Sequence, residues 1–134
     1  MPAALLDTNA ISDLMRDHPP LLARIALHAD PITTSVMVAG EIRYGLERLP
    51  PGKKRTDLEA RANRVLANVR IEAVTESVAD TYGRLKASLE SQGLTLVDND
   101  LWIAATALTL GSVLVTRDAI FSRIPGLQVE DWSV

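Results

Sequence analysis

The sequence contains no cysteine, and only 4% of its 134 residues are aromatic. The absence of cysteine excludes disulfides, thiolate nucleophiles and thiolate-bound metals, so any metal must be held by oxygen or histidine. The low aromatic content argues against a platform on which single-stranded bases stack. No basic leader precedes an apolar segment at the N-terminus, and no apolar run approaches the roughly 18 residues that span a bilayer. These absences predict a cytoplasmic protein without a membrane segment.

What is present is the composition of an ordinary globular domain, with 47% hydrophobic and 23% charged residues. A chain of this length can bury a substantial core. Short apolar runs alternate with amphipathic helical stretches, which is the pattern of an α/β fold. We therefore predict a single α/β domain over residues 1–134, with a central, mainly parallel sheet of about four to five strands flanked by helices.

The expected elements follow from hydrophobic periodicity and from proline, glycine and capping residues. Strands are predicted at 3–6, 32–34, 70–74, 113–115 and, as an edge strand, 127–129. Helices are predicted at 10–16, 19–29, 36–49, 54–68, 76–92 and 101–110. The third and fourth helices are separated only by a proline- and glycine-containing turn, so they should form a hairpin.

Two of the predicted strands stop at aspartate and threonine. The first runs into Asp7 and Thr8, and the fourth runs into Thr116 and then Asp118. The carboxyl ends of parallel strands lie along one edge of a sheet, where open α/β proteins place their sites. We therefore expect these side chains to come together at that edge.

Two further acids belong to helices near the same edge. Asp100 falls in the first turn of a helix, where the dipole favours a carboxylate, and Glu41 lies at the margin of the apolar stripe of the third helix. Each acid also has an ordinary explanation: Asp7 or a neighbour caps the next helix, Asp98 caps and Asp100 compensates the dipole, and Glu41 is solvated. One shared cause explains the four better than four separate ones.

Carboxylates gathered within a few Å repel one another, so such a cluster usually implies a divalent cation. Oxygen ligands select Mg²⁺ or Mn²⁺, and Mg²⁺ commonly shares its site with a substrate phosphate. Phosphodiester hydrolysis suits this arrangement, because the metal neutralises the phosphate and lowers the pKa of a bound water. No side-chain nucleophile is needed.

Four segments, in this order, resemble the motifs of the PIN-domain ribonucleases, and in particular of the VapC toxins of bacterial type II toxin-antitoxin pairs. They are Leu6-Asp7-Thr8-Asn9, Ala39-Gly40-Glu41-Ile42-Arg43-Tyr44-Gly45, Asp100-Leu101-Trp102-Ile103-Ala104-Ala105-Thr106-Ala107 and Leu114-Val115-Thr116-Arg117-Asp118. Each segment alone is weak evidence, but four at appropriate spacing are specific. Residues 124–132 resemble the family's closing segment, whereas residues 50–75 match only in being helical and basic.

The resemblance implies that the catalytic and metal-binding set is the same group of four acids: Asp7, Glu41, Asp100 and Asp118. Supporting hydrogen bonds to the ligands or the scissile phosphate would come from Thr8, Asn9, Ser35 and Thr116. Asp98 would be a spare acid near the site that either joins this supporting set or only caps the helix. The implied reaction is Mg²⁺- or Mn²⁺-dependent endonucleolytic cleavage of RNA, which leaves a 3′-hydroxyl and a 5′-phosphate. Structured cellular RNA, either tRNA or rRNA, would be the target, and loss of translation and growth the result.

An acidic site repels RNA, so binding energy must come from elsewhere on the surface. The net charge of −3 hides an uneven distribution, because residues 43–70 contain eight basic and three acidic residues. This segment indicates a polyanionic partner, and we predict phosphate contacts for Arg43, Arg48, Lys53, Lys54 and Arg55. The alternative is a solvated helix face with ordinary charge pairs.

The resemblance also implies partners: a second copy of the chain in a homodimer, and a VapB-like antitoxin that inserts a helix beside the site. The apolar side of the predicted helical hairpin is the candidate groove for that helix. Its residues are Ala39, Ile42, Leu46 and Leu66. The competing interpretation is that they belong to the intramolecular core.

Other functions fit the sequence less well. A non-catalytic PIN-like module that binds RNA or protein is the main alternative, although it leaves four acids without a use. A haloacid-dehalogenase-type phosphatase or a receiver domain needs a late lysine, and none follows Lys86; the phosphatase also needs an aspartate where Asn9 stands. A histidine-dependent hydrolase is poorly supported, because His18 and His28 both lie early, beside helix ends.

Overall fold

Five short parallel strands, in the order β3-β2-β1-β4-β5, form the centre of the computed structural model, which describes residues 2–134. The strands are β1 (Ala4–Leu6), β2 (Ile32–Ser35), β3 (Arg70–Glu72), β4 (Val113–Val115) and β5 (Val129–Glu130). In the register of the sheet, Leu6 of β1 lies opposite Thr34 of β2 and Val115 of β4. The carboxyl ends of the three middle strands are therefore level, as predicted.

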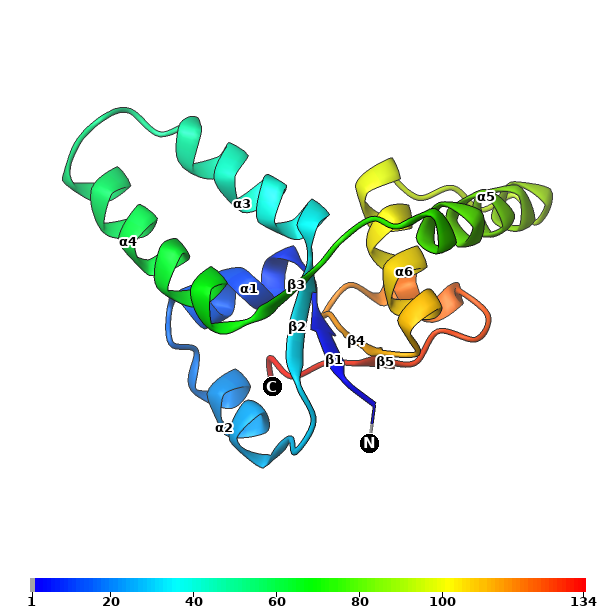
Figure 1. Cartoon of the computed structure of the whole chain (residues 1–134), viewed down its shortest axis with the longest axis horizontal. Helices are drawn as coiled ribbons and strands as arrows, with labels where there is room; N and C mark the ends of the chain where they lie inside the picture. Colours follow the sequence, from blue (N-terminus) through cyan, green and yellow to red (C-terminus); the bar gives the residue numbers. More distant parts are fainter. Residues whose placement is uncertain (1) are drawn as a thin grey trace.

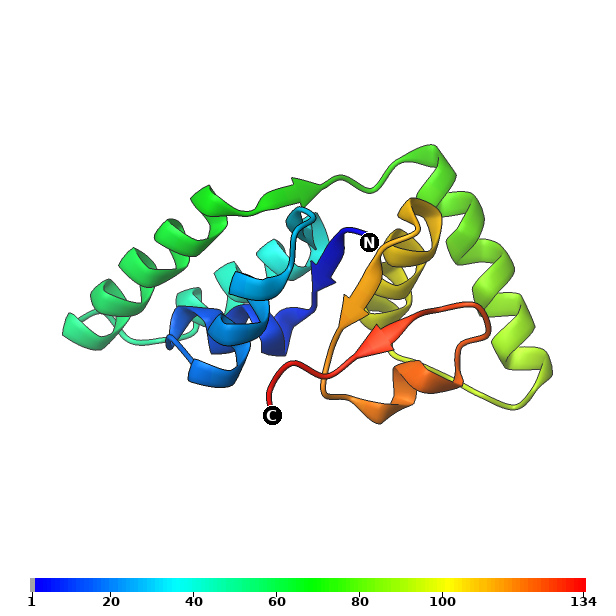
Figure 2. The same ribbon diagram turned by 90° about the horizontal axis from the view of Figure 1, so that it is seen from below.

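The helices cover both faces of this sheet (Figures 1 and 2). They are α1 (Thr8–Met15), α2 (Pro19–Leu27), α3 (Val36–Glu47), α4 (Lys53–Asn68), α5 (Glu76–Ser91) and α6 (Asp98–Leu110), with a short 3₁₀ helix, η1 (Ala119–Arg123). In both views α1–α4 lie on one side of the sheet, and α5 and α6 lie on the other. The predicted α/β fold is confirmed. Within residues 2–134, no helix is both long and apolar enough to cross a membrane.

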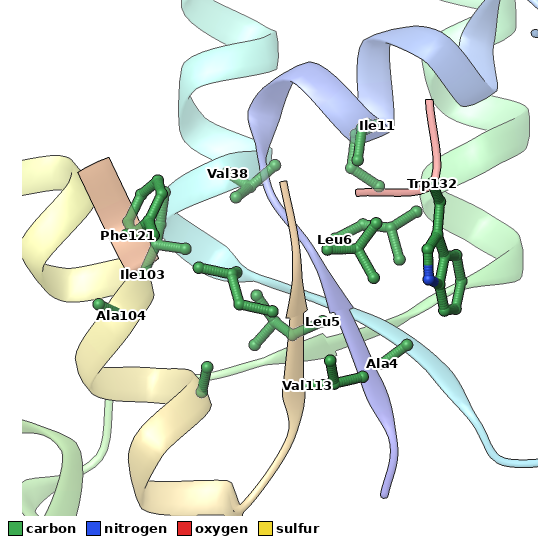
Figure 3. Close-up of a cluster of buried hydrophobic side chains, with 14 of the residues drawn as sticks. Ala4, Leu5, Leu6, Ile11, Val38, Ile103, Ala104, Val113, Phe121 and Trp132 are labelled. Carbon is green, nitrogen blue, oxygen red and sulfur yellow. The ribbon is translucent and has the colours of Figure 1, made fainter. Parts of the chain in front are cut away.

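The central strand β1 packs on both layers of helices, which is why it is apolar throughout. Ala4, Leu5 and Leu6 are completely buried. Because successive side chains of a strand point to opposite faces, Leu5 faces Ile103 of α6 while Leu6 faces Ile11 of α1 (Figure 3). A strand buried on both faces lacks polar alternation, as parallel strands generally do.

Side-chain caps begin the helices that leave the carboxyl edge of the sheet. Asp7 accepts a hydrogen bond from the Ala10 N–H, and Ser35 accepts one from the Val38 N–H. At the other end of α6, Gly111 adopts a φ of 65°, which L-residues with a side chain rarely take, and turns the chain into β4. These local signals fix where the chain crosses the edge that carries the acids.

Several predicted elements are wrong at their ends. Helix α6 begins at Asp98 instead of residue 101, α1 begins at Thr8 instead of residue 10, and α2 and α3 each end two residues earlier than predicted. The edge strand lies at Val129–Glu130 instead of 127–129, and the third strand stops at Glu72 instead of residue 74. Both are outer strands, whose extent depends on pairing with a single neighbour. Asp98 is not the N-cap of α6, because Val97 holds that position and Asp98 is the first helical residue.

The apolar side of the α3–α4 hairpin is not an open groove. Ile42, Leu46 and Leu66 are 6–8% exposed, and Ile42 and Leu46 belong to the main hydrophobic core. They are buried because α3 and α4 both pack on α1 as well as on each other. The prediction that this face receives a partner's helix is therefore wrong for these three residues; only Ala39 is partly exposed.

Candidate active site

Asp7 is held at the carboxyl end of β1 in a fixed orientation. Its side chain is buried, with the residue 5% exposed, and its Oδ1 accepts the Ala10 N–H at 2.9 Å. The Thr116 hydroxyl also hydrogen-bonds to the carboxylate. Burial raises the pKa of Asp7 above its ordinary value, and the negative charge of Asp118 raises it further, whereas these hydrogen bonds and Arg117 oppose the change.

Thr116 links the ends of the two central strands. Its Oγ1 accepts the Asp118 N–H at 3.0 Å while its hydroxyl hydrogen points to Asp7. Asp118 in turn accepts the Ile120 N–H at 3.1 Å and so begins η1. The hydroxyl of Thr116 therefore orients Asp7 through the carboxylate of that residue and Asp118 through its backbone N–H.

Asp100 enters the same region from α6, on the other side of the sheet. It is the third residue of that helix and is partly buried. Burial raises its pKa to about 6, and repulsion from Glu41, Asp118 and Asp7 contributes to this rise. The four predicted acids are therefore close enough to act on one another electrostatically.

Glu41 projects from α3, which contacts α6. Its Oε1 is buried and has no hydrogen-bond partner, and the same is true of Thr8 Oγ1 at the first residue of α1. Buried polar atoms without a partner are rare in folded proteins and are costly, so each requires an explanation. A cation or a hydrogen-bonding ligand in this region would provide one.

The residues present fit a divalent cation. The donors are carboxylate oxygens alone, one of them unpartnered, and Asp100 is in surroundings that penalise its negative charge. Among residues 2–134 no three acidic or histidine side chains are close enough to form a ready-made ligand shell. Ligation of one cation by these acids would therefore require side-chain movements.

The remaining predicted residues differ in what they contact. Ser35 uses its hydroxyl to cap α3, and Asn9 is exposed in the first turn of α1. Asp98 is exposed and accepts hydrogen bonds from Tyr82 at 2.9 Å and Lys86 at 3.2 Å, both on α5. These contacts hold Asp98 against α5, and its role in the site stays a prediction.

The five predicted RNA-binding residues are spread over the α3–α4 hairpin, and most are paired. Arg55 bonds to Glu47 and Glu59, and Arg43 donates to Asn63. The others are exposed: Lys53 pairs with Asp57, Arg48 lies over the Tyr44 ring, and Lys54 extends from the first turn of α4. Their role in RNA binding stays a prediction.

Sequence reasoning missed the ion pairs of a buried carboxylate beside the acids, Asp13. Asp13 of α1, whose side chain is 5% exposed, forms an ion pair with Arg117 at 2.7 Å and another with Arg16. Arg117 follows Thr116 and is the one cation whose charge acts to lower the pKa of Asp7. The available signal was an aspartate inside the short helical run between Ile11 and Met15, which needs a cationic partner if that face is buried.

Comparison with known proteins gives one consistent result. A family model, described as the PIN domain, matches residues 4–127. Ribonuclease VapC1 of Haemophilus influenzae (strain R2866) is 34% identical to this chain, over 96% of this chain and 97% of its own length. Ribonuclease VapC2 of Rickettsia felis is 31% identical over 96% of each.

Solved structures agree with the sequence relatives. The crystal structure of VapBC2 from Rickettsia felis bound to a promoter DNA fragment contains a chain that superposes with a TM-score of 0.88 at 29% identity, over 97% of this chain and 98% of that one. This similarity covers all four segments that carry the acids. The chain therefore belongs to the PIN-domain family and, within it, to the VapC group.

Proposed function

We propose that this protein is a Mg²⁺- or Mn²⁺-dependent endoribonuclease that acts as the toxin of a bacterial toxin-antitoxin pair in the cytoplasm. The observation that carries the proposal is the gathering of Asp7, Glu41, Asp100 and Asp118 at one edge of the sheet, with Glu41 Oε1 buried and unpartnered. The curated relatives are named ribonucleases, which supports the same reaction. A module that only binds RNA would not need a carboxylate cluster that raises the pKa of its own members.

The proposed metal ligands are the four acids, and the reaction is hydrolysis of a phosphodiester. When bound, the cation supplies positive charge against the phosphate and makes water acidic enough to attack at neutral pH. Thr116 and the Ala10 N–H hold the Asp7 carboxylate in one orientation. The unpartnered Thr8 hydroxyl is available to a phosphate oxygen. The oxygen of the attacking water bonds to phosphorus as the bond from phosphorus to the 3′ oxygen breaks. The water gives up a proton and the 3′ oxygen gains one, which leaves a 3′-hydroxyl and a 5′-phosphate.

The proposed substrate is structured cellular RNA, with tRNA and rRNA as the candidates. Only 4% of residues are aromatic, so base stacking contributes little, and recognition must come from RNA shape and backbone. Cleavage of either RNA would stop translation and therefore growth.

The proposed partners are a VapB-like antitoxin and a second copy of the chain. VapBC complexes from Rickettsia felis and Haemophilus influenzae have been solved, the latter containing a chain with a TM-score of 0.85 to this one. The site itself favours inhibition by a basic residue, because a guanidinium placed among the acids would relieve the repulsion that acts on Asp100.

Cleavage of total bacterial RNA by the purified chain tests the activity. We expect discrete fragments with Mg²⁺ or Mn²⁺, none with chelator, and a cleavage rate lower by about a hundredfold or more for Asp7→Asn and Asp100→Asn, since each removes a negative charge from the proposed metal ligands. Mapping the fragment ends identifies the target.

Asp80→Asn is the matched control, because Asp80 is an exposed acid on α5 and its replacement changes the net charge by the same amount. It should cleave as the natural chain does. Cleavage that persists in Asp7→Asn, or that does not depend on metal, would contradict the proposal and favour the non-catalytic module.

A further inference from the structure

A basic hollow lies between the end of α1 and the first half of α4. Its volume is about 570 Å³, and it is lined by four cations, one acid and one apolar residue: Arg16, Lys53, Lys54, Arg61, Asp57 and Leu58. Two of these cations, Arg16 and Arg61, lie outside the group that the sequence predicted for RNA binding. The hollow therefore defines a different basic surface from the hairpin as a whole.

Arg61 is fixed at the wall of this hollow. Its Nη1 donates to the Met15 carbonyl at 3.0 Å, at the C-terminal end of α1, where the helix dipole favours a cation. That bond uses one of five N–H donors, so most of the guanidinium remains available to a ligand. Lys53 pairs with Asp57, but its side chain is 88% exposed, and such a surface pair holds it only weakly.

Two ion pairs of Asp13 connect the hollow to the acid site. Asp13 pairs with Arg16, which lines the hollow, and with Arg117, whose charge acts on Asp7. One buried carboxylate thus holds two guanidinium groups on neighbouring sides of α1. Because α1 has eight residues, the distance from Asp7 to the hollow along the helix is only about 12 Å.

We propose that Arg117, Arg16 and the hollow with Lys53, Lys54 and Arg61 form one phosphate track that binds the backbone of the RNA strand leading away from the acid site. The inference rests on the proposed nuclease function and identifies the surface that overcomes the repulsion of RNA by the four acids. Arg43 and Arg55 are not part of it, because neither lines the hollow.

Fluorescence anisotropy of a labelled RNA hairpin tests the track, with the full chain in chelator so that binding is read without cleavage. We expect Lys53→Ala/Lys54→Ala to raise the Kd about tenfold or more at roughly 50 mM KCl and to reduce the slope of log K against log salt by about 1.5. Lys53→Arg/Lys54→Arg should restore both quantities. The two lysines are exposed, so the variants should fold.

The matched control is Arg84→Ala/Arg123→Ala, which removes the same charge from exposed positions on α5 and η1. It should change the salt slope little. If the lysine variant binds RNA as tightly as the natural chain, or loses no more RNA affinity than this control, the proposed track is overturned. Loss of binding to a polyglutamate peptide with RNA binding intact would also overturn it and assign the hollow to an acidic protein.

Failure of the proposed nuclease function can be distinguished from failure of the phosphate track. An active enzyme whose RNA affinity is unchanged in the lysine variant overturns the track alone. A chain that cleaves no RNA, but loses RNA binding in the lysine variant, overturns the nuclease and supports the track.

Discussion

Asp7 shows that a capping role and a role in the site are compatible in one residue. Its Oδ1 accepts the Ala10 N–H, which leaves Oδ2 to face other groups. This decides which variant is informative. An asparagine keeps an oxygen that can cap the helix and removes only the charge, whereas alanine would also cost about 1 kcal/mol of stability.

The raised pKa of Asp100 predicts that this residue destabilises the metal-free protein at neutral pH. In the folded chain its pKa is about 6, and in the unfolded chain it takes the ordinary value of 3.8. Between these values the folded state binds more protons, so stability falls as pH rises through this window and the loss is complete above it. Asp100→Asn should raise the Tm by about 4 °C at pH 8, or on the order of 1 kcal/mol given the solvated part of the carboxyl, and by less at pH 5.

Thermal unfolding in chelator at the two pH values measures this difference, and Asp98→Asn is the control from the same helix turn. Hydrogen bonds from Tyr82 and Lys86 hold the pKa of Asp98 below its ordinary value, so its charge stabilises the fold. Its replacement should lower the Tm at pH 8. An Asp100 variant no more stable than the natural chain at pH 8 would contradict the repulsion described here.

The four acids were predictable because each follows a local signal: a strand end, a helix start or the margin of an apolar stripe. The ion pair of Asp13 with Arg117 was not, because its members are far apart in the chain and meet only when β4 pairs with β1. The unpartnered Glu41 oxygen likewise depends on the packing of α3 against its neighbours, which no local pattern reports.

At the scale of elements, the side chain of Arg55 joins the two helices of the α3–α4 hairpin. Arg55 bonds to Glu47 and to the Leu49 carbonyl across the turn and to Glu59 on its own helix, and its side chain is only 23% exposed. We expect Arg55→Ala to lower the free energy of unfolding by about 1–1.5 kcal/mol, the range for lost partly buried charged hydrogen bonds.

Urea denaturation followed by circular dichroism measures this loss. Lys54→Ala is the control, because Lys54 is the exposed neighbour of Arg55 in the same helix turn and its replacement should change stability by less than about 0.5 kcal/mol. Equal effects of the two substitutions would show that the hairpin is held by its apolar side alone.

The bounds of α4 were predicted more closely than those of the outer strands, for a physical reason. A helix such as α4 is specified by its own stripe of Leu58, Ala62 and Val65 and by the glycine before it, so its bounds differ from expectation by one residue. Strands β3 and β5 have two or three residues and pair on one side only. Their ends follow from the neighbouring strand, and a single segment of sequence does not report them.

At the scale of the whole molecule, the candidate site joins both layers of the fold. Asp7 lies at the end of β1, where α1 begins, and Glu41 lies on α3, whereas Asp100 lies on α6. Helices α1 and α3 are on one side of the sheet and α6 is on the other (Figure 1). A ligand that binds all of them binds only the folded state and must stabilise the entire domain.

Manganese should therefore raise the Tm. A concentration of 100 times the Kd corresponds to about 2.7 kcal/mol, which for a domain of this size gives a rise of several degrees. Differential scanning fluorimetry with MnCl₂ and with chelator measures the rise. It should disappear in Asp7→Asn and persist in Asp80→Asn; a rise of equal size in both would indicate binding elsewhere on the surface.

The position of β1 at the centre of the sheet also affects how the protein is made. β1 is synthesised first, yet one of its two neighbours, β4, contributes Val113 opposite Ala4, a gap of roughly 110 residues. At ribosomal rates of about 5–20 residues per second, this strand stays without that partner for on the order of ten seconds. During that time Asp7 and Asp118 cannot meet, so the four acids cannot assemble before residue 118 has been synthesised. A cell translating the chain therefore has an interval in which the proposed inhibitor can be made.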